Sequence, residues 1–391
     1  MLTQQEQAII KATVPLLEAQ GEALTQHFYK IMLSEYTDVR PLFNQAAQET
    51  GRQPRALANS LLMYAKHIDA LENLGDLVEL VIHKHASLQI LPEQYAIVGT
   101  CLLRAIKEVL GEDIATDEVM AAWKQAYFDL ADLLSQKEED LYSQTELAEG
   151  GWRGERLFYV ADKVKESDII TSFYLKPVDG KPIVAHKAGQ YLGFRFVFLD
   201  GEQRRNYSIS DKANGEYYRI SVKREEGGVV SNYLHNDVKV GDRLRVFPPF
   251  GTFTLQPSER PIALISGGVG ITPMVSMLEE ALETDRDVYF IHAAQNHDVD
   301  PFYDWLYEKA TQHPHLTVFK CYEDNESNKA HHEGLLNKEL LGELLPTTDI
   351  DVYFLGPTPF MTMLHKALAE LGVPKAQCYY EFFGPAEALS E

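Results

Sequence analysis

The chain has 391 residues, enough for two or three domains with substantial cores. Hydrophobic residues make up 45% and charged residues 24%, a globular balance that argues against disorder or fibrous repeats. Its 36 Lys and Arg against 58 Asp and Glu give a net charge of −22, so we expect neither nucleic acid nor an anionic membrane surface as a partner. Three scattered cysteines exclude a disulfide framework, and the start MLTQQEQAII lacks a signal-peptide pattern, which predicts a cytoplasmic protein without integral membrane contact.

Residues 1–142 have the pattern of an all-α domain. Thr3 and Glu6 have the spacing of a capping box at a helix start. Further along, apolar residues recur every three or four positions, which is typical of helices facing a common core. Three polar residues, His85, Tyr95 and Glu138, lie on such apolar rows, so we expect them to point into the core.

The pattern leaves two interpretations of these polar residues open. A core-facing His is most often a hydrogen-bonded structural residue, and Glu138 could reach solvent from a helix end. Alternatively, His85 ligates a metal through one ring nitrogen, while Glu138 and Tyr95 hold the N–H of the other and make the imidazole more electron-donating.

Two further domains are expected after a linker at residues 143–152. Residues 153–257 contain short alternating segments rich in β-branched and aromatic residues, which predicts an antiparallel β-barrel or sandwich. Residues 258–391 alternate between strand and helix patterns, which predicts an α/β domain with a parallel sheet. The fold class is therefore multidomain: all-α, then antiparallel β, then α/β.

A glycine-rich loop follows the first strand of the α/β domain and precedes a helix expected to begin near Pro273. Glycines let the backbone approach a pyrophosphate, and a helix N-terminus offers amide donors to the anion. The alternative to a pyrophosphate-binding loop is a glycine turn with only a structural role. The loop also differs from the GxGxxG pattern. The positions concerned are Gly268, Val269, Gly270, Ile271, Thr272 and Pro273.

Four motifs in fixed order resemble the ferredoxin-NADP reductase superfamily. The resemblance implies that the barrel binds FAD, with Tyr191 as a further flavin contact and residues 227–232 as the flavin-phosphate segment, and that the α/β domain binds NAD(P)H. After the strand at 287–294, Asp298 and Asp300 would repel a 2′-phosphate, which favours NADH over NADPH. The motifs are Arg205-Asn206-Tyr207-Ser208, the glycine loop, Leu355-Gly356-Pro357 and Glu381-Phe382-Phe383-Gly384-Pro385.

The first 140 or so residues look like a globin, carried by Tyr29 in HFYK, Phe43 in PLFN and His85 in HKHASLQI. With the reductase half, the chain resembles the bacterial flavohaemoglobin family nearly end to end. The resemblance implies a haem b, non-covalent because no CxxCH is present, with His85 as its proximal ligand. The other implied roles are haem packing by Phe43, a distal pocket of Tyr29, Gln53 and Leu57, a proximal pair of Tyr95 and Glu138, and tuning of haem and flavin by Lys84 and Glu381.

Gln53 precedes Pro54, and a residue before proline is biased away from helical dihedrals. We therefore expect Gln53 to lie just before a helix, which leaves Tyr29 as the safer distal hydrogen-bond donor.

The resemblance implies nitric oxide dioxygenase activity, a detoxification in which two NO, two O₂ and one NAD(P)H give two nitrates. A flavin suits this task because it takes two electrons at once as a hydride and releases them singly. One alternative is an NADH-driven reductase of peroxides, ferric chelates or O₂. Another is an oxygen carrier or sensor, against which the attached reductase argues. We expect a monomer whose partners are NO, O₂ and NAD(P)H.

Overall fold

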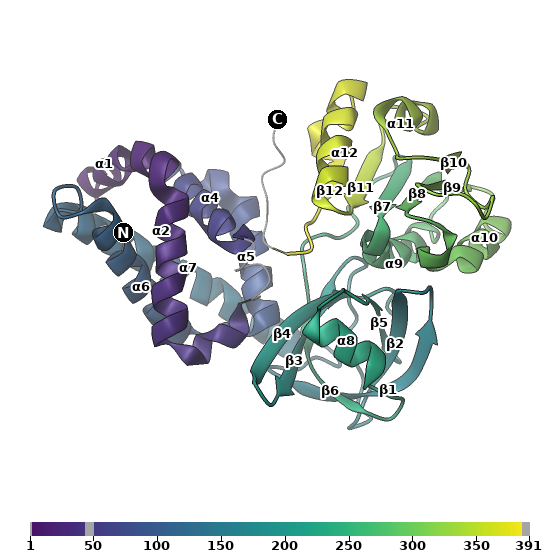
Figure 1. The fold of residues 1–391 in the computed structure, drawn as a ribbon, viewed down its shortest axis with the longest axis horizontal. Coiled ribbons are helices and arrows are strands. Elements are labelled where there is room, and N and C mark those ends of the chain that lie inside the picture. The colour runs from purple at the N-terminus through teal and green to yellow at the C-terminus, as the bar shows by residue number, and fades with distance from the viewer. Residues whose placement is uncertain (1, 44–50, 385–391) are drawn as a thin grey trace. The chain divides into compact units, whose positions relative to one another are not determined.

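The computed structural model describes residues 2–43 and 51–384 (Figure 1). The chain divides into two compact units: the first is mainly residues 1–147, and the second holds most of the residues from 148 onward. Across the described ranges, none of the helices has both the length and the apolar character needed to span a bilayer.

The first unit is helical, as predicted. Its capping box is confirmed, because the Glu6 amide donates to the Thr3 hydroxyl at 3.2 Å and the Glu6 carboxylate accepts from the Thr3 amide at 2.7 Å. The elements are α1 (Gln4–Ala12), α2 (Val14–Glu35), the 3₁₀ turn η1 (Thr37–Leu42), α4 (Arg52–Lys66), the 3₁₀ turn η2 (Leu71–Leu74), α5 (Gly75–Leu88), α6 (Pro92–Leu110) and α7 (Asp117–Leu147).

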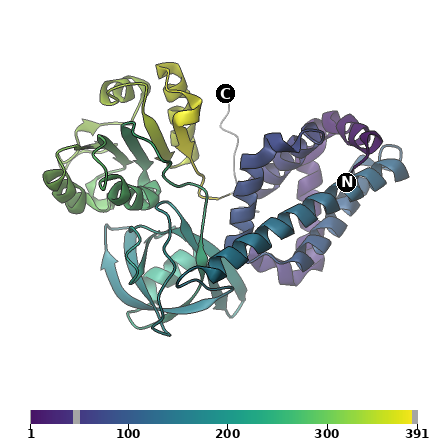
Figure 2. The same ribbon diagram turned by 180° about the vertical axis from the view of Figure 1, so that it is seen from behind.

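A tight contact between α6 and α7 helps to fix this helical core. A Cβ at Gly99 on α6 would lie 2.4 Å from the Tyr127 ring on α7, so only glycine permits this approach. Figure 2, from behind, shows α7 along its length. The helix continues to Leu147, inside the segment expected to be a linker, since Tyr142 is buried and its hydroxyl donates to the Ile90 carbonyl at 2.9 Å.

The expectation that Gln53 precedes its helix is wrong. Helix α4 begins at Arg52 with Gly51 as its N-cap, so Gln53 lies in the first turn. Amides in a first helical turn have no acceptor within the helix, so Pro54 loses no hydrogen bond there. Gly51 takes φ +71°, and the Thr25 hydroxyl from α2 donates to the Pro54 carbonyl at 2.8 Å, which holds this turn in place.

The second unit begins with a six-stranded sheet in the order β4-β3-β6-β1-β2-β5, which curls around a buried core containing Phe158, Phe173 and Phe194 (Figure 1). The pairings of β1 with β2 and β6, and of β2 with β5, are antiparallel, as predicted. The elements are β1 (Arg156–Lys165), β2 (Ile170–Pro177), β3 (Tyr191–Phe198), β4 (Gly201–Ser208), β5 (Tyr218–Lys223), α8 (Val229–Asn236) and β6 (Arg243–Phe250).

A parallel sheet in the order β10-β9-β8-β7-β11-β12 follows, which confirms the α/β prediction. Helices α9 and α10 pack on one face and α11 and α12 on the other. Helix α9 begins two residues before Pro273, which suits a first-turn position. The elements are β7 (Ile262–Gly267), η3 (Gly268–Gly270), α9 (Ile271–Ala281), β8 (Val288–Ala294), η4 (His297–Val299), α10 (Tyr303–Gln312), β9 (Leu316–Tyr322), β10 (His332–Glu333), α11 (Lys338–Leu344), β11 (Asp351–Leu355), α12 (Thr358–Leu371), η5 (Lys375–Gln377) and β12 (Cys378–Tyr380).

Candidate functional site

Three helices of the first unit bring His85, Tyr95 and Glu138 together. His85 from α5 places Nδ1 2.8 Å from Glu138 Oε1 of α7 and 2.8 Å from the Tyr95 hydroxyl of α6. The Tyr95 hydroxyl in turn donates to Glu138 Oε1 at 2.6 Å. Glu138 is 2% exposed, so its carboxylate does not reach solvent from a helix end. The expected hydrogen bonds from Glu138 and Tyr95 to His85 are present, whereas metal binding by His85 stays a prediction.

The hydrogen bonds determine which nitrogen of His85 carries a proton. Burial raises the pKa of Tyr95, and the Glu138 charge raises it further. The phenol therefore stays protonated and donates a hydrogen bond to Glu138. Both partners of Nδ1 can then only accept, so Nδ1 carries a hydrogen and Nε2 is the nitrogen left for a metal. Within the described residues, no polar group bonds Nε2. An imidazole held in this way fits a ligand of a haem iron.

Glu138→Gln tests this hydrogen bond because it keeps the side-chain size while replacing the carboxylate with a neutral amide. We expect haem affinity or turnover to fall about 10- to 100-fold, as for other outer-shell partners of metal ligands. In resonance Raman spectra the iron–histidine stretch should move to lower frequency, because the imidazole donates less electron density. Glu139→Gln, at the exposed next position, is the control. An unmoved stretch in Glu138→Gln would count against the assignment.

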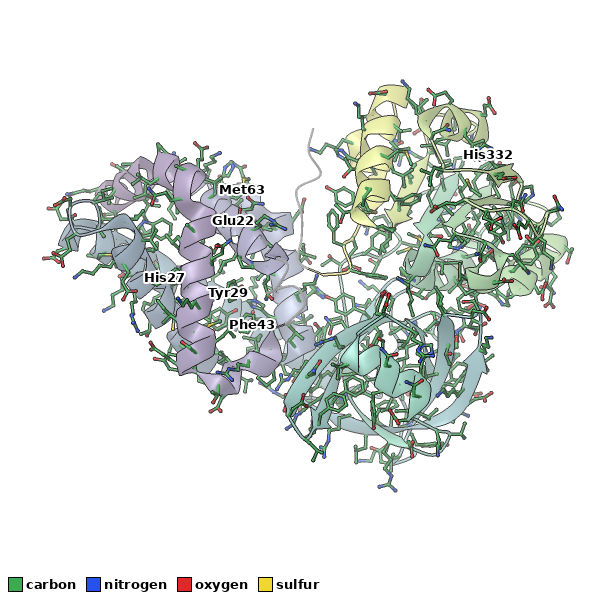
Figure 3. All side chains as sticks on the ribbon, viewed as in Figure 1. Glu22, His27, Tyr29, Phe43, Met63 and His332 are labelled. Carbon is green, nitrogen blue, oxygen red and sulfur yellow. The ribbon has the colours of Figure 1, made fainter. Side chains whose placement is uncertain are left out.

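The residues expected on the distal side come from α2, η1 and α4. Tyr29 is 6% exposed, and its ring meets the Phe43 ring edge-on with centroids 5.5 Å apart (Figure 3). Phe43 and Leu57 are partly buried and pack on the same core as Tyr29. The side-chain oxygen Oε1 of Gln53 is buried and has no hydrogen-bond partner among the described residues. An orphaned amide oxygen is costly in a protein interior and suits a pocket that receives a polar ligand.

The residues expected to hold flavin come from neighbouring strands β3 and β4. Tyr191 opens β3 and Ser208 closes β4, and the adjoining backbones meet where the Ile209 amide donates to the Gln190 carbonyl at 2.9 Å. Asn206 and Tyr207 precede Ser208 on β4, and the Tyr207 ring lies 5.7 Å from the Phe194 ring. Arg205 donates to the Gln203 side chain and the Arg204 carbonyl, each at 2.7 Å. Strand pairing thus gathers aromatic, cationic and hydroxyl groups at one edge, a set that fits a flavin and its phosphates.

Helix α8, which contains most of the expected flavin-phosphate segment, is held at its far end by a residue that sequence reasoning missed. Lys163 on β1 donates its ammonium to the carbonyls of Leu234, His235 and Val238 at 3.0, 2.8 and 2.7 Å. A cation there satisfies the last carbonyls and complements the helix dipole. At the other end, α8 follows Gly227, which takes φ +70°, and the amides of a first helical turn can bind an anion.

The glycine loop connects β7 to α9 through η3. Gly268 takes φ +54°, and a Cβ there would meet no atom within 4 Å, so the backbone faces open space. Gly270, in contrast, lies against β11: a Cβ would be 2.2 Å from the Leu355 carbonyl oxygen. Val269, Ile271 and Thr272 complete the loop, and the Thr272 hydroxyl donates to the Val269 carbonyl at 3.0 Å. An open backbone leading into a helix N-terminus fits a coenzyme pyrophosphate.

The remaining expected residues follow β12, except Lys84, which lies half-buried beside His85 on α5. Glu381 is buried, Phe382 packs against the sheet core and Phe383 is 45% exposed. Gly384 takes φ +134°, and Pro385 lies outside the described residues.

The expectation that Asp300 repels a 2′-phosphate is wrong. Asp300 is 3% exposed, and its carboxylate accepts from the Lys320 ammonium at 2.8 Å and from the Tyr322 hydroxyl at 2.5 Å. Only Asp298, which is exposed, still supports the preference for NADH. Sequence reasoning missed the partners of Asp300, although Lys320 stands out as a lone charge in the apolar strand LTVFKCY.

His292, beside this ion pair, should make the domain acid-sensitive. Burial lowers its pKa to about 3 from an ordinary 6.5. The unfolded chain therefore binds a proton below about pH 6.5 that the folded chain refuses until about pH 3, so stability falls as the pH drops through this window. When the pH is lowered from 7 to 5, the free energy of unfolding of this domain in urea should fall by about 2 kcal/mol more in the wild type than in His292→Gln. An equal fall in the free energy of unfolding in the two proteins would show that His292 is not the group that makes the domain acid-sensitive.

Comparison with known proteins matches all three parts of the chain. Profiles of the globin family, an oxidoreductase FAD-binding domain and an oxidoreductase NAD-binding domain match residues 26–134, 159–255 and 264–366. The flavohaemoproteins of Pseudomonas aeruginosa and Pseudomonas putida are each 58% identical, over 100% of both chains. A solved flavohaemoglobin from Malassezia yamatoensis with bound FAD and haem has a TM-score of 0.87 and 27% identity, and the match covers 98% of this chain and 100% of that one. The flavohaem-like FAD/NAD-binding domain of a nitric oxide dioxygenase from Vibrio cholerae has a TM-score of 0.56 and 37% identity, over 60% of this chain and 100% of that one.

Proposed function

Because the chain belongs to the flavohaemoprotein family, we propose that it is a nitric oxide dioxygenase. The reaction is 2 NO + 2 O₂ + NAD(P)H → 2 NO₃⁻ + NAD(P)⁺ + H⁺, in which the coenzyme supplies two electrons. NO and O₂ are small and uncharged, so an apolar route suffices for their entry, and the polar side chains serve the cofactors and the developing charge.

The chain is an oxidoreductase with a globin domain, an FAD-binding domain and an NAD-binding domain, and its cofactors are haem, FAD and a nicotinamide coenzyme. When bound, FAD takes one hydride, with its two electrons, from the coenzyme and passes on single electrons, while haem offers an iron that binds small gases.

On the haem side, His85 Nε2 would hold the iron. The bonds from Nδ1 to Glu138 and Tyr95 fix the ring orientation and make the imidazole a stronger donor. On the other side, the buried Tyr29 hydroxyl would donate a hydrogen bond to an oxygen that gains negative charge during the reaction. Gln53, in the first turn of α4, would offer its amide to the same ligand.

On the reductase side, Tyr191, Tyr207 and Ser208 would contact the flavin ring, and Arg205 its phosphates. The backbone of the glycine loop would receive the coenzyme pyrophosphate. Glu381, which is buried just after β12, would help to set the polarity around the flavin, and Lys84 that around the haem.

The observation that carries the proposal is the imidazole held by Glu138 and Tyr95 in a chain that also carries FAD- and NAD-binding domains. Storage or sensing of oxygen requires no continuous electron supply, so the reductase domains favour turnover over carriage. A reductase of peroxides, ferric chelates or O₂ would use the same electron path with a different acceptor.

The test is to measure NADH oxidation in air-saturated buffer before and after adding NO, together with the nitrate formed. We expect NO to accelerate NADH oxidation and to yield two nitrates per NADH consumed. An NADH oxidation rate that does not respond to NO would overturn the proposal in favour of the other reductase activities. A stable oxygen complex with no NADH consumption would favour a carrier.

A further inference from the structure

A row of polar side chains crosses the parallel sheet at the carboxyl ends of three neighbouring strands. Ser266 of β7, His292 of β8 and Lys320 of β9 are direct partners in the strand register. The row continues the face that α9 and α10 cover, where the earlier positions of the strands are apolar. With Asp300 and Tyr322 these residues form a group that we call the Lys320 cluster, and every member is between 0% and 3% exposed.

Short contacts connect the cluster from one end to the other. The Lys320 ammonium lies 2.8 Å from both Asp300 oxygens, and the Tyr322 hydroxyl donates to Oδ2 at 2.5 Å. Asp300 Oδ1 lies 3.3 Å from His292 Nε2, an electrostatic contact without hydrogen-bond geometry, and Nδ1 of the same ring lies 2.8 Å from the Ser266 hydroxyl. Because burial keeps the imidazole neutral and Nε2 faces the carboxylate, the N–H belongs on Nε2 and the Ser266 hydroxyl donates to Nδ1.

The location of the cluster indicates its role better than its energetics do. A buried ion pair is weak evidence for stability, because desolvation of the two charges offsets their attraction. Ligands of parallel α/β sheets bind outside the carboxyl ends of the strands. Ser266 directly precedes the glycine loop, and Asp300 ends the segment through η4 that follows β8. The cluster therefore connects the bases of two loops on the coenzyme-binding edge.

We propose that the Lys320 cluster positions the glycine loop for the nicotinamide coenzyme. The Lys320–Asp300 ion pair lies against the Nε2 side of His292, the other nitrogen of His292 accepts from the Ser266 hydroxyl, and Ser266 holds the start of the loop. None of the five side chains needs to touch the coenzyme, so these are positioning residues. The inference rests on the NAD-binding domain and not on the choice of NO as substrate.

Ser266→Ala is the mildest test because it removes one hydroxyl and leaves the ion pair intact. The readout is NADH-driven ferricyanide reduction by the full chain carrying its cofactors, an assay that needs neither NO nor electron transfer to haem. We expect the KM for NADH to rise about 5-fold, the effect of one lost hydrogen bond, with kcat unchanged. Ser276→Ala is the matched control, since Ser276 is equally buried in this domain but donates to the Asp211 carbonyl at 2.8 Å.

The double variant Asp300→Asn with Lys320→Met tests the other end of the cluster without leaving an unpaired buried charge. We expect it to raise the KM for NADH at unchanged kcat, as Ser266→Ala does. A KM equal to wild type in both variants would overturn the proposal. So would a KM rise in Ser276→Ala as large as in Ser266→Ala, because that would show a general effect of loosening the domain. Failure of the NO assay alone would leave these comparisons intact.

Discussion

His85→Ala should purify without haem while keeping FAD and NADH-driven ferricyanide reduction. The substitution removes the imidazole whose Nε2 would hold the iron and leaves Glu138 and Tyr95 without their shared partner. The loss of haem affinity should exceed the about 10- to 100-fold that outer-shell changes cost, because the iron–nitrogen bond itself disappears. The measurement is the ratio of Soret absorbance to flavin absorbance in purified protein.

His27→Ala is the matched control for this experiment. His27 lies on α2, and its Nε2 lies 2.6 Å from the Glu108 carboxylate near the surface (Figure 3). Its removal should leave the Soret band at wild-type intensity. A normal Soret band in His85→Ala would contradict the proposed ligand, and loss of FAD together with haem would point to general unfolding.

Gly270→Ala should strongly slow the reduction of the flavin by NADH while leaving haem and FAD bound. A Cβ at this position would be 2.2 Å from the Leu355 carbonyl oxygen and 2.7 Å from its carbon, so backbone must move and the coenzyme loop with it. Displacement of a binding element by about 1 Å can lower a rate about 100-fold, and we expect kcat/KM for NADH in ferricyanide reduction to fall on this order.

Gly342→Ala in α11 is the control for the added methyl group. Its Cβ would lie 3.1 Å from Leu371 Cδ2, the mobile end of a side chain that can rotate away. Activity with NADH should then stay at the wild-type level. If Gly270→Ala had wild-type kcat/KM, the loop would not hold the coenzyme in the proposed way.

Local pattern was enough to predict much of this molecule. Apolar residues at helical spacing show which side of a helix faces the core as well as that the segment is helical, so the sequence alone predicts that His85, Tyr95 and Glu138 point into one core. Strand alternation and glycine placement likewise predicted the antiparallel sheet and the loop before α9.

The errors arise where distant residues decide the outcome. The prediction for Gln53 rests only on its neighbour Pro54. Gly51 and the Thr25 hydroxyl allow a helical turn to form at Gln53 and Pro54. The sequence predicts that Asp300 repels a 2′-phosphate, and this is wrong because Asp300 pairs with Lys320, twenty residues away on β9. Tyr142 extends α7 through a bond to Ile90, a contact that periodicity within α7 does not contain. In each case a single tertiary hydrogen bond outweighs the local preference.

The most direct test of the whole account is anaerobic mixing of the purified protein with NADH in a stopped-flow spectrometer. If the three domains form one electron path to an iron held by His85, the flavin absorbance near 450 nm should bleach and the haem bands should then shift from ferric to ferrous. Flavin that bleaches while the haem stays ferric would contradict the account.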